Sequence, residues 1–154
     1  MIRRLARTFH KLAQCQHGGM ALETVFIAPV LITLSLGGFE VSKIVARQTE
    51  LQSAAAEVAS VVRASVPETS EDRTTIRDIV VESAGVTNED VSVVEVYRCG
   101  TGSTYSDTLP TCSTGAVLSK YIRVTIADRY QPMWTDFGIG SALDFSVTRT
   151  ILVG

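Results

Sequence analysis

An uninterrupted apolar run near the N-terminus separates a basic leader from a mixed, mostly polar remainder. Sixteen residues without charge lie between Glu23 and Glu40. With their apolar neighbours on both sides, they reach roughly the twenty residues that an α-helix needs to cross ~30 Å of hydrocarbon at ~1.5 Å per residue. The pattern therefore predicts a transmembrane helix over residues 19–41, preceded by a leader over 1–18.

The polar and helix-breaking residues inside this run are compatible with a membrane helix. Thr33 and Ser35 can return their hydroxyls to backbone carbonyls of the preceding turn, and Pro29 is tolerated where water does not compete for the backbone. The alternative is a buried helix of a soluble protein, and the basic residues that precede the run argue against it.

A helical pattern continues beyond the run, with apolar residues every three or four positions. We predict an amphipathic extension over 42–66 that Pro67 ends. On its solvent face we expect Glu40 to pair with Lys43, and Arg47 with Glu50. The predicted inward stripe is Val41, Ile44, Leu51, Ala55, Val58 and Val62.

The remainder, 67–154, predicts a small α+β body. Thr69 or Ser70 can cap a short helix that Gly85 ends, with an inner face of Ile76, Ile79, Val80 and Ala84. Three stretches rich in β-branched and aromatic residues then predict an antiparallel sheet: 91–99, 120–130 and 142–154. We expect the sheet's apolar face to be covered by the extension of the long helix, which gives a pilin-like α+β fold.

The distribution of charge indicates how the chain crosses the membrane. The leader holds four Lys and Arg against no acid, and the rest holds ten against all sixteen Asp and Glu, so +4 is followed by −6. Positive charge favours the cytoplasmic side, which places the body over 67–154 outside the cytoplasm. Nothing downstream gathers Lys or Arg densely enough to bind nucleic acid.

The cysteines divide in the same way as the charge. Cys15 lies in the leader, where a thiol stays reduced. Cys99 and Cys112 flank a loop rich in Gly, Ser and Thr, and export to an oxidising compartment would allow them to form a disulfide.

No catalytic or cofactor-binding set stands out. The two histidines, His10 and His17, lie in the leader, and the chain has no Gly-x-Ser-x-Gly, no phosphate-binding loop and no Cys-x-x-Cys. We expect neither an enzyme, nor a metal site, nor a cofactor.

Glu23, at the start of the apolar run, is the most informative residue. A carboxylate in such a segment costs roughly 3 kcal/mol and is a functional candidate by default. It lies five residues after Gly18 and four after Gly19, behind a basic leader. This arrangement resembles the processing site of type IV prepilins, and the run GGMALETVFIAPVLITLSLGGFEVSKIVARQTELQSAAAEVA resembles the TadE-like minor pilins, or pseudopilins, of tight-adherence (Tad/Flp) pilus systems.

The resemblance implies a non-catalytic pilus assembly protein. A prepilin peptidase would cut after Gly18, so that Glu23 is the fifth mature residue; a cut after Gly19 would make it the fourth. Glu23 would then pair with the N-terminal amine of a neighbouring subunit. The implied partners are other pilins and the assembly platform of the bacterial inner membrane, with the body in the periplasm or incorporated into a pilus. Thr24 stands where the major pilins of these systems carry tyrosine.

Two other classes of protein share some of these features. One is a single-pass protein with an uncleaved signal anchor and a periplasmic binding domain. The other is a secreted protein cut after a small-residue site such as 35–37.

Overall fold

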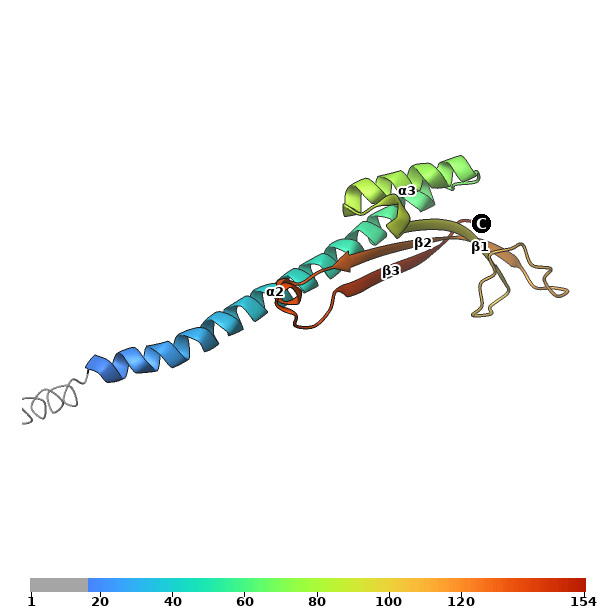
Figure 1. The fold of residues 1–154 in the computed structure, drawn as a ribbon. Coiled ribbons are helices and arrows are strands. Elements are labelled where there is room, and N and C mark those ends of the chain that lie inside the picture. Colours follow the sequence, from blue (N-terminus) through green and yellow to red (C-terminus); the bar gives the residue numbers. More distant parts are fainter. Residues whose placement is uncertain (1–16) are drawn as a thin grey trace, which may run out of the picture. The chain divides into compact units, whose positions relative to one another are not determined.

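The computed structural model describes residues 17–154. Most of the predicted leader, with Cys15 and His10, lies outside the described residues. The chain divides into two units, with the boundary between Ser42 and Lys43. One long helix, α2 (His17–Ser65), contains the end of the first unit and the start of the second (Figure 1).

In the first unit, Pro29, Thr33 and Ser35 all lie within α2, as predicted for a continuous helix. Pro29 lies inside the helix. The Thr33 hydroxyl donates to the Pro29 carbonyl and the Ser35 hydroxyl to the Leu31 carbonyl, both at 2.8 Å. The predicted return of both hydroxyls to the backbone is confirmed, so neither side chain needs a partner from outside the helix.

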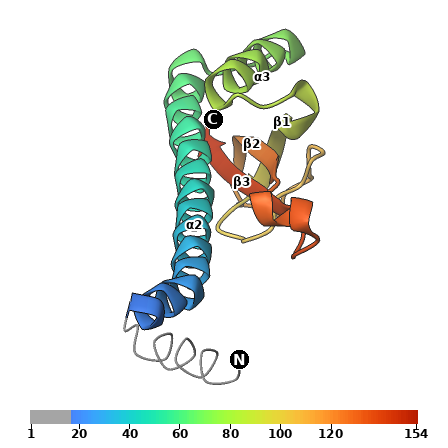
Figure 2. The ribbon, with the colours of Figure 1, turned by 60° about the vertical axis from the view of Figure 1, so that its left-hand side comes forward.

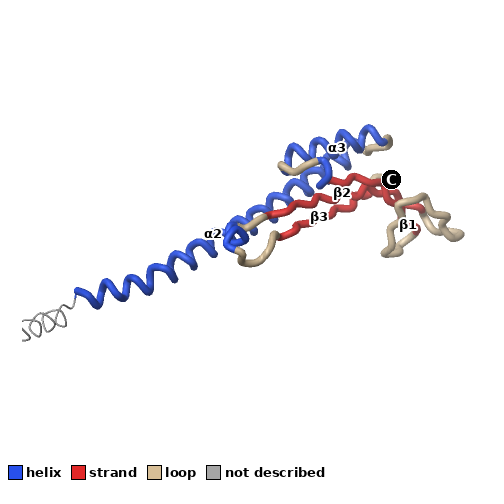
Figure 3. The backbone as a smooth tube through the Cα atoms, in the orientation of Figure 1, coloured by secondary structure: helices blue, strands red, loops and turns tan. Residues whose placement is uncertain are grey.

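The second unit is a two-helix, three-strand body. After α2 come α3 (Ser70–Ala84), η1 (Asn88–Asp90), β1 (Val91–Cys99), β2 (Leu118–Tyr130), η2 (Met133–Phe137) and β3 (Leu143–Leu152). The strands form one antiparallel sheet in the order β1-β2-β3 (Figure 3). The α+β fold class is confirmed, and each predicted strand is present with its ends shifted by two residues or fewer.

Both ends of α3 are fixed by local chemistry. The Thr69 side chain accepts from the Asp72 amide, and the Asp72 carboxylate accepts in return from the Thr69 amide. This capping box satisfies backbone donors that a helix start leaves without partners. Gly85 ends the helix with φ of 62°, in the left-handed region that glycine adopts without strain. Thr69 is therefore the cap, rather than Ser70.

The core of the body joins both helices to one face of the sheet. In the central strand the side chains of Ile122, Val124 and Ile126 are fully buried. Against them pack α3 and the second part of α2 (Figure 2). The helical members of this cluster are Leu51, Ala54, Ala55, Val58, Val62, Ile76, Val80 and Ala84.

Three residues on the helices are placed differently from the prediction, and the helical period explains why. Val41 is 54% exposed, whereas Glu40 is only 2% exposed. Successive residues of an α-helix point about 100° apart, so position 40 can be buried while position 41 is exposed, and the predicted inward placement of Val41 is wrong. In α3 residues 76, 80 and 84 are buried and residues 73, 77 and 81, on one side of them, are half-buried. Ile79 lies on the other side of the buried residues and is 43% exposed, so its predicted place on the inner face is wrong.

Candidate assembly site

The glycine pair and Glu23 lie in the first two turns of α2. The helix begins at His17, so Gly18 and Gly19 are both in its first turn. Glu23 follows about one turn later and is exposed. Its side chain borders a shallow hollow on the side of the helix whose other walls include Ile27 and Leu31. A carboxylate is thus presented at the edge of an apolar surface.

The helix following Glu23 exposes apolar side chains on every side. The large apolar residues from Leu22 to Phe39 are each between 46% and 71% exposed. The helix is long and apolar enough to cross a membrane. Water-exposed apolar surface on this scale costs roughly 25 cal/mol per Å², and such surfaces usually face lipid or a partner protein. Its composition is that of a membrane anchor.

An ion pair fastens the second part of α2 to the sheet. Arg47 donates from Nε to the Asp128 carboxylate of β2 at 2.6 Å and from Nη1 to Glu50 at 2.9 Å. The hydrogen bond to Asp128 raises the pKa of Arg47 above its ordinary value, despite the opposing effect of burial. The predicted pair with Glu50 is confirmed. The prediction that Arg47 lies on the solvent face is wrong, because its side chain is only 21% exposed and binds across to the strand.

A second charged cluster ties α3 to the first two strands. The Glu95 carboxylate of β1 binds Arg73 of α3 at 3.2 Å and Lys120 of β2 at 3.0 Å, and it accepts the Tyr97 hydroxyl. Burial raises the pKa of Glu95, but the hydrogen bonds from Tyr97 and Lys120 and the nearby positive charges outweigh it and leave the pKa below its ordinary value. Sequence analysis missed this cluster. The signal was an acid at an inward position of the alternating strand VSVVEVYRC.

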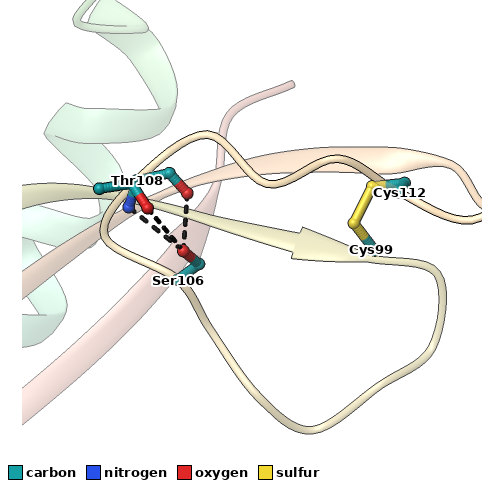
Figure 4. Close-up of a disulfide and its surroundings, with 4 residues drawn as sticks. All are labelled: Cys99, Ser106, Thr108 and Cys112. Carbon is teal, nitrogen blue, oxygen red and sulfur yellow. Dashed lines mark hydrogen bonds between the residues drawn. A yellow bond between two sulfur atoms is a disulfide. The ribbon is translucent and has the colours of Figure 1, made fainter.

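The predicted disulfide between Cys99 and Cys112 is present, with 5.5 Å between the Cα atoms (Figure 4). The loop that it closes is paired to the edge of β1, where Tyr97 and Ser106 exchange both backbone hydrogen bonds at 2.8 and 2.9 Å. The Ser106 hydroxyl donates to the Thr108 carbonyl at 2.7 Å and accepts from its amide (Figure 4). The loop is therefore an ordered part of the body.

An aromatic and basic cluster holds the same loop against the outer face of the sheet. The ring of Tyr105 meets that of Tyr121 edge to face, with 5.2 Å between centroids. The guanidinium of Arg98 lies 5.0 Å from the Tyr121 centroid, and that of Arg123 lies 5.4 Å from the Tyr105 centroid. Such contacts contribute ~0.5–1 kcal/mol each at exposed sites. The polar composition of the loop gave no sign of this cluster.

Within residues 17–154, no three His, Cys, Asp or Glu side chains are grouped so that they could hold a metal ion. The partly buried carboxylates of Asp128 and Glu95 instead make ion pairs that join secondary-structure elements of the body.

A comparison with protein-family models identifies a TadE-like protein domain at residues 18–60. The match begins at the glycine pair and ends within the part of α2 that packs into the body, and it covers fewer than a third of the 154 residues. Neither the curated proteins nor the solved structures include a match to this chain.

Proposed function

Because residues 18–60 form a TadE-like domain, we propose that this protein is a non-catalytic component of tight-adherence pilus assembly. In this proposal it is made as a precursor, cut by a prepilin peptidase after Gly18, and retained in the inner membrane by α2. The observation that supports it most directly is an exposed apolar helix with a single carboxylate, Glu23, near its start, inside the region that matches the family.

Cleavage would change the electrostatics of this end of the chain. It would remove the four basic residues of the leader and create an α-amino group next to the apolar surface. A lone carboxylate in that environment costs roughly 3 kcal/mol or more. Pairing it with the amine of a neighbouring subunit stabilises both charges, since leaving one member of such a pair alone costs about 3–5 kcal/mol. Pairing of Glu23 with that amine would therefore set how far neighbouring subunits are shifted along one another in the assembly.

The proposed topology follows from charge and from the fold. The basic leader stays in the cytoplasm, residues 19–41 span the membrane, and 42–66 rise from it as the helix on which the periplasmic body is built. The disulfide between Cys99 and Cys112 is consistent with an oxidising compartment. The partners of the span would be the helices of other pilins and pseudopilins and the assembly platform.

The experiment that tests processing is to determine the N-terminal residue of the protein recovered from membranes. A cut after Gly18 yields Gly19, and a cut after Gly19 yields Met20. An intact Met1 would contradict processing and support an uncleaved anchor, and an N-terminus near Gly38 would support a secreted protein.

A matched pair of glycine variants sharpens the test. Gly18→Val with Gly19→Val should leave unprocessed precursor. The control is Gly37→Val with Gly38→Val in the same helix, where an added Cβ meets no atom within 4 Å. It should be cut normally, and loss of cleavage in both variants would overturn the assignment of the site.

Glu23→Gln separates processing from assembly. It removes the charge and keeps the size of the side chain, so we expect normal cleavage and few or no pili. Wild-type piliation from this variant would exclude a pairing role for Glu23.

A further inference from the structure

The connection between β2 and β3 carries the most exposed large apolar side chain of the body. Phe137 is 79% exposed, Ile139 is 64% exposed and Met133 is 45% exposed. All three fall within ten residues of chain that otherwise consist of small, polar or proline residues and the only tryptophan, Trp134. We refer to Met133, Phe137 and Ile139 as the apolar tip.

The apolar tip is held out by a well-bonded turn. Pro132 is fully buried at its base, and its carbonyl accepts the Thr135 hydroxyl at 2.7 Å. The Gly138 amide donates to the Thr135 carbonyl at 3.0 Å with φ of 73°, a left-handed conformation that places glycine between the two exposed residues. The Ile139 amide closes the turn on the Trp134 carbonyl at 3.1 Å.

The half-buried Trp134 lies across this turn. A Cβ on Gly140 would lie 3.4 Å from the indole nitrogen, so the ring lies beside that glycine. The hydrogen bonds fix the backbone of the turn. The side chains of Phe137 and Ile139 are exposed on it to water, where apolar surface costs roughly 25 cal/mol per Å².

The tip lies at one particular end of the body. Asp128, two residues before the end of β2, binds Arg47, which is one turn from Lys43, the first residue of the second unit. The tip comes after Asp128 in the chain, at the end of the sheet where β2 finishes and β3 begins. The Cys99–Cys112 loop lies at the opposite end, where β1 finishes and β2 begins (Figure 1).

We propose that the apolar tip inserts into the periplasmic surface of the lipid bilayer that α2 crosses. This rests on the proposed function only in that α2 must span the membrane. The helix then leaves the lipid near Lys43, at the end of the body that carries the tip. Aromatic and aliphatic side chains beside a tryptophan are typical of protein segments in the headgroup region.

A lipid surface suits the tip better than another protein does. The tip is a small protrusion rather than a broad face, and a protein partner with this little contact would bind weakly. The bilayer is present at high local concentration as soon as α2 is inserted. Insertion would hold the body down on the membrane before assembly, and release of the tip would accompany extraction of the subunit.

The single tryptophan permits a direct test without labelling. The full-length protein is reconstituted in phosphatidylethanolamine and phosphatidylglycerol vesicles whose acyl chains are brominated close to the headgroup, and Trp134 fluorescence is compared with that in unbrominated vesicles. We expect strong quenching. Phe137→Ser with Ile139→Ser should lose most of it.

The matched control moves the tryptophan to the other end of the sheet. Leu109 is 67% exposed in the disulfide loop, so Trp134→Phe with Leu109→Trp places an exposed tryptophan away from the proposed contact. Its fluorescence should not change with bromination.

Each other outcome has a definite meaning. Protein that floats with the vesicles while Trp134 stays unquenched would overturn the insertion of the tip and leave the anchor intact. Failure to float would instead remove the anchor on which the proposed function depends. Quenching that is strong in dilute protein and falls as subunits become crowded would support insertion before assembly, whereas Trp134 that stays unquenched at every lipid-to-protein ratio would overturn the proposal.

Discussion

Replacing Val58 by alanine tests whether the second part of α2 forms the core of the body. Val58 is 1% exposed, and Val45 on the same helix is 59% exposed, so Val45→Ala is a control with identical chemistry. At Val58 the loss of two methyl groups costs ~1.6 kcal/mol at ~0.8 kcal/mol per carbon. The cavity adds to this, because the neighbours Ala54 and Ala55 have no side chain long enough to fill it.

Alanine is also the better helix former, by up to about 0.7 kcal/mol, but this gain is the same at both positions. The difference between the two variants therefore isolates burial, and we expect ~2 kcal/mol. The assay is urea unfolding of the full-length protein in detergent micelles, followed by the fluorescence of Trp134 in the body. With a slope of about 1–3 kcal/mol per M, the midpoint of Val58→Ala should fall by roughly 1 M relative to Val45→Ala. Equal midpoints would refute the packing of α2 against the sheet.

Three further perturbations test other parts of the body. Replacing Cys99 and Cys112 by serine should lower the free energy of unfolding by about 3 kcal/mol, the chain-entropy value for a loop of this length, and an unchanged urea midpoint would contradict it. The folded-state pKa of Glu95 lies below its ordinary value, so its ionised form stabilises the fold above the unfolded-state pKa, and this contribution is lost as the pH falls through the folded-state pKa. Glu95→Gln should therefore have a lower melting temperature than wild type at neutral pH and the same melting temperature in acid. A difference that persists in acid would argue against the ion pairs. Gly85→Ala should cost about 1 kcal/mol, because a Cβ at φ of 62° is strained although no atom obstructs it, and a thermal melt equal to wild type would show that the end of α3 rearranges.

The two proposals together give α2 three uses along its length. Its first turns carry the proposed cleavage site and Glu23, its middle would cross the bilayer, and its last turns supply the core onto which α3 and the sheet pack. Within the body, the ion pair of Arg47 with Asp128 joins the second part of α2 to β2.

Much of the candidate site could be predicted from sequence because its signals are local. A run of sixteen uncharged residues predicts a membrane-spanning or deeply buried helix, and an acid at its start is unusual enough to mark a functional candidate. The caps of α3 could also be predicted, since Thr69 and Gly85 form hydrogen bonds with backbone groups three and four residues away in the chain. The roles of the glycine pair and of Glu23 stay predictions, because they concern a peptidase and a second subunit.

The amino-acid pattern by itself determined the long helix, the short helix, the three strands and the disulfide partners, since each depends on periodicity or on residues close in the chain. Tertiary structure alone decided which charges would be buried and with whom. Arg47 looked like a surface residue paired along the helix, until packing on β2 brought Asp128 to it from 81 positions away. The same holds for Glu95, whose partners come from α3 and β2, and for Tyr105, which packs on a strand that follows it. Local propensity fixes where an element begins and ends, but the partner of a charge depends on which elements the core brings side by side.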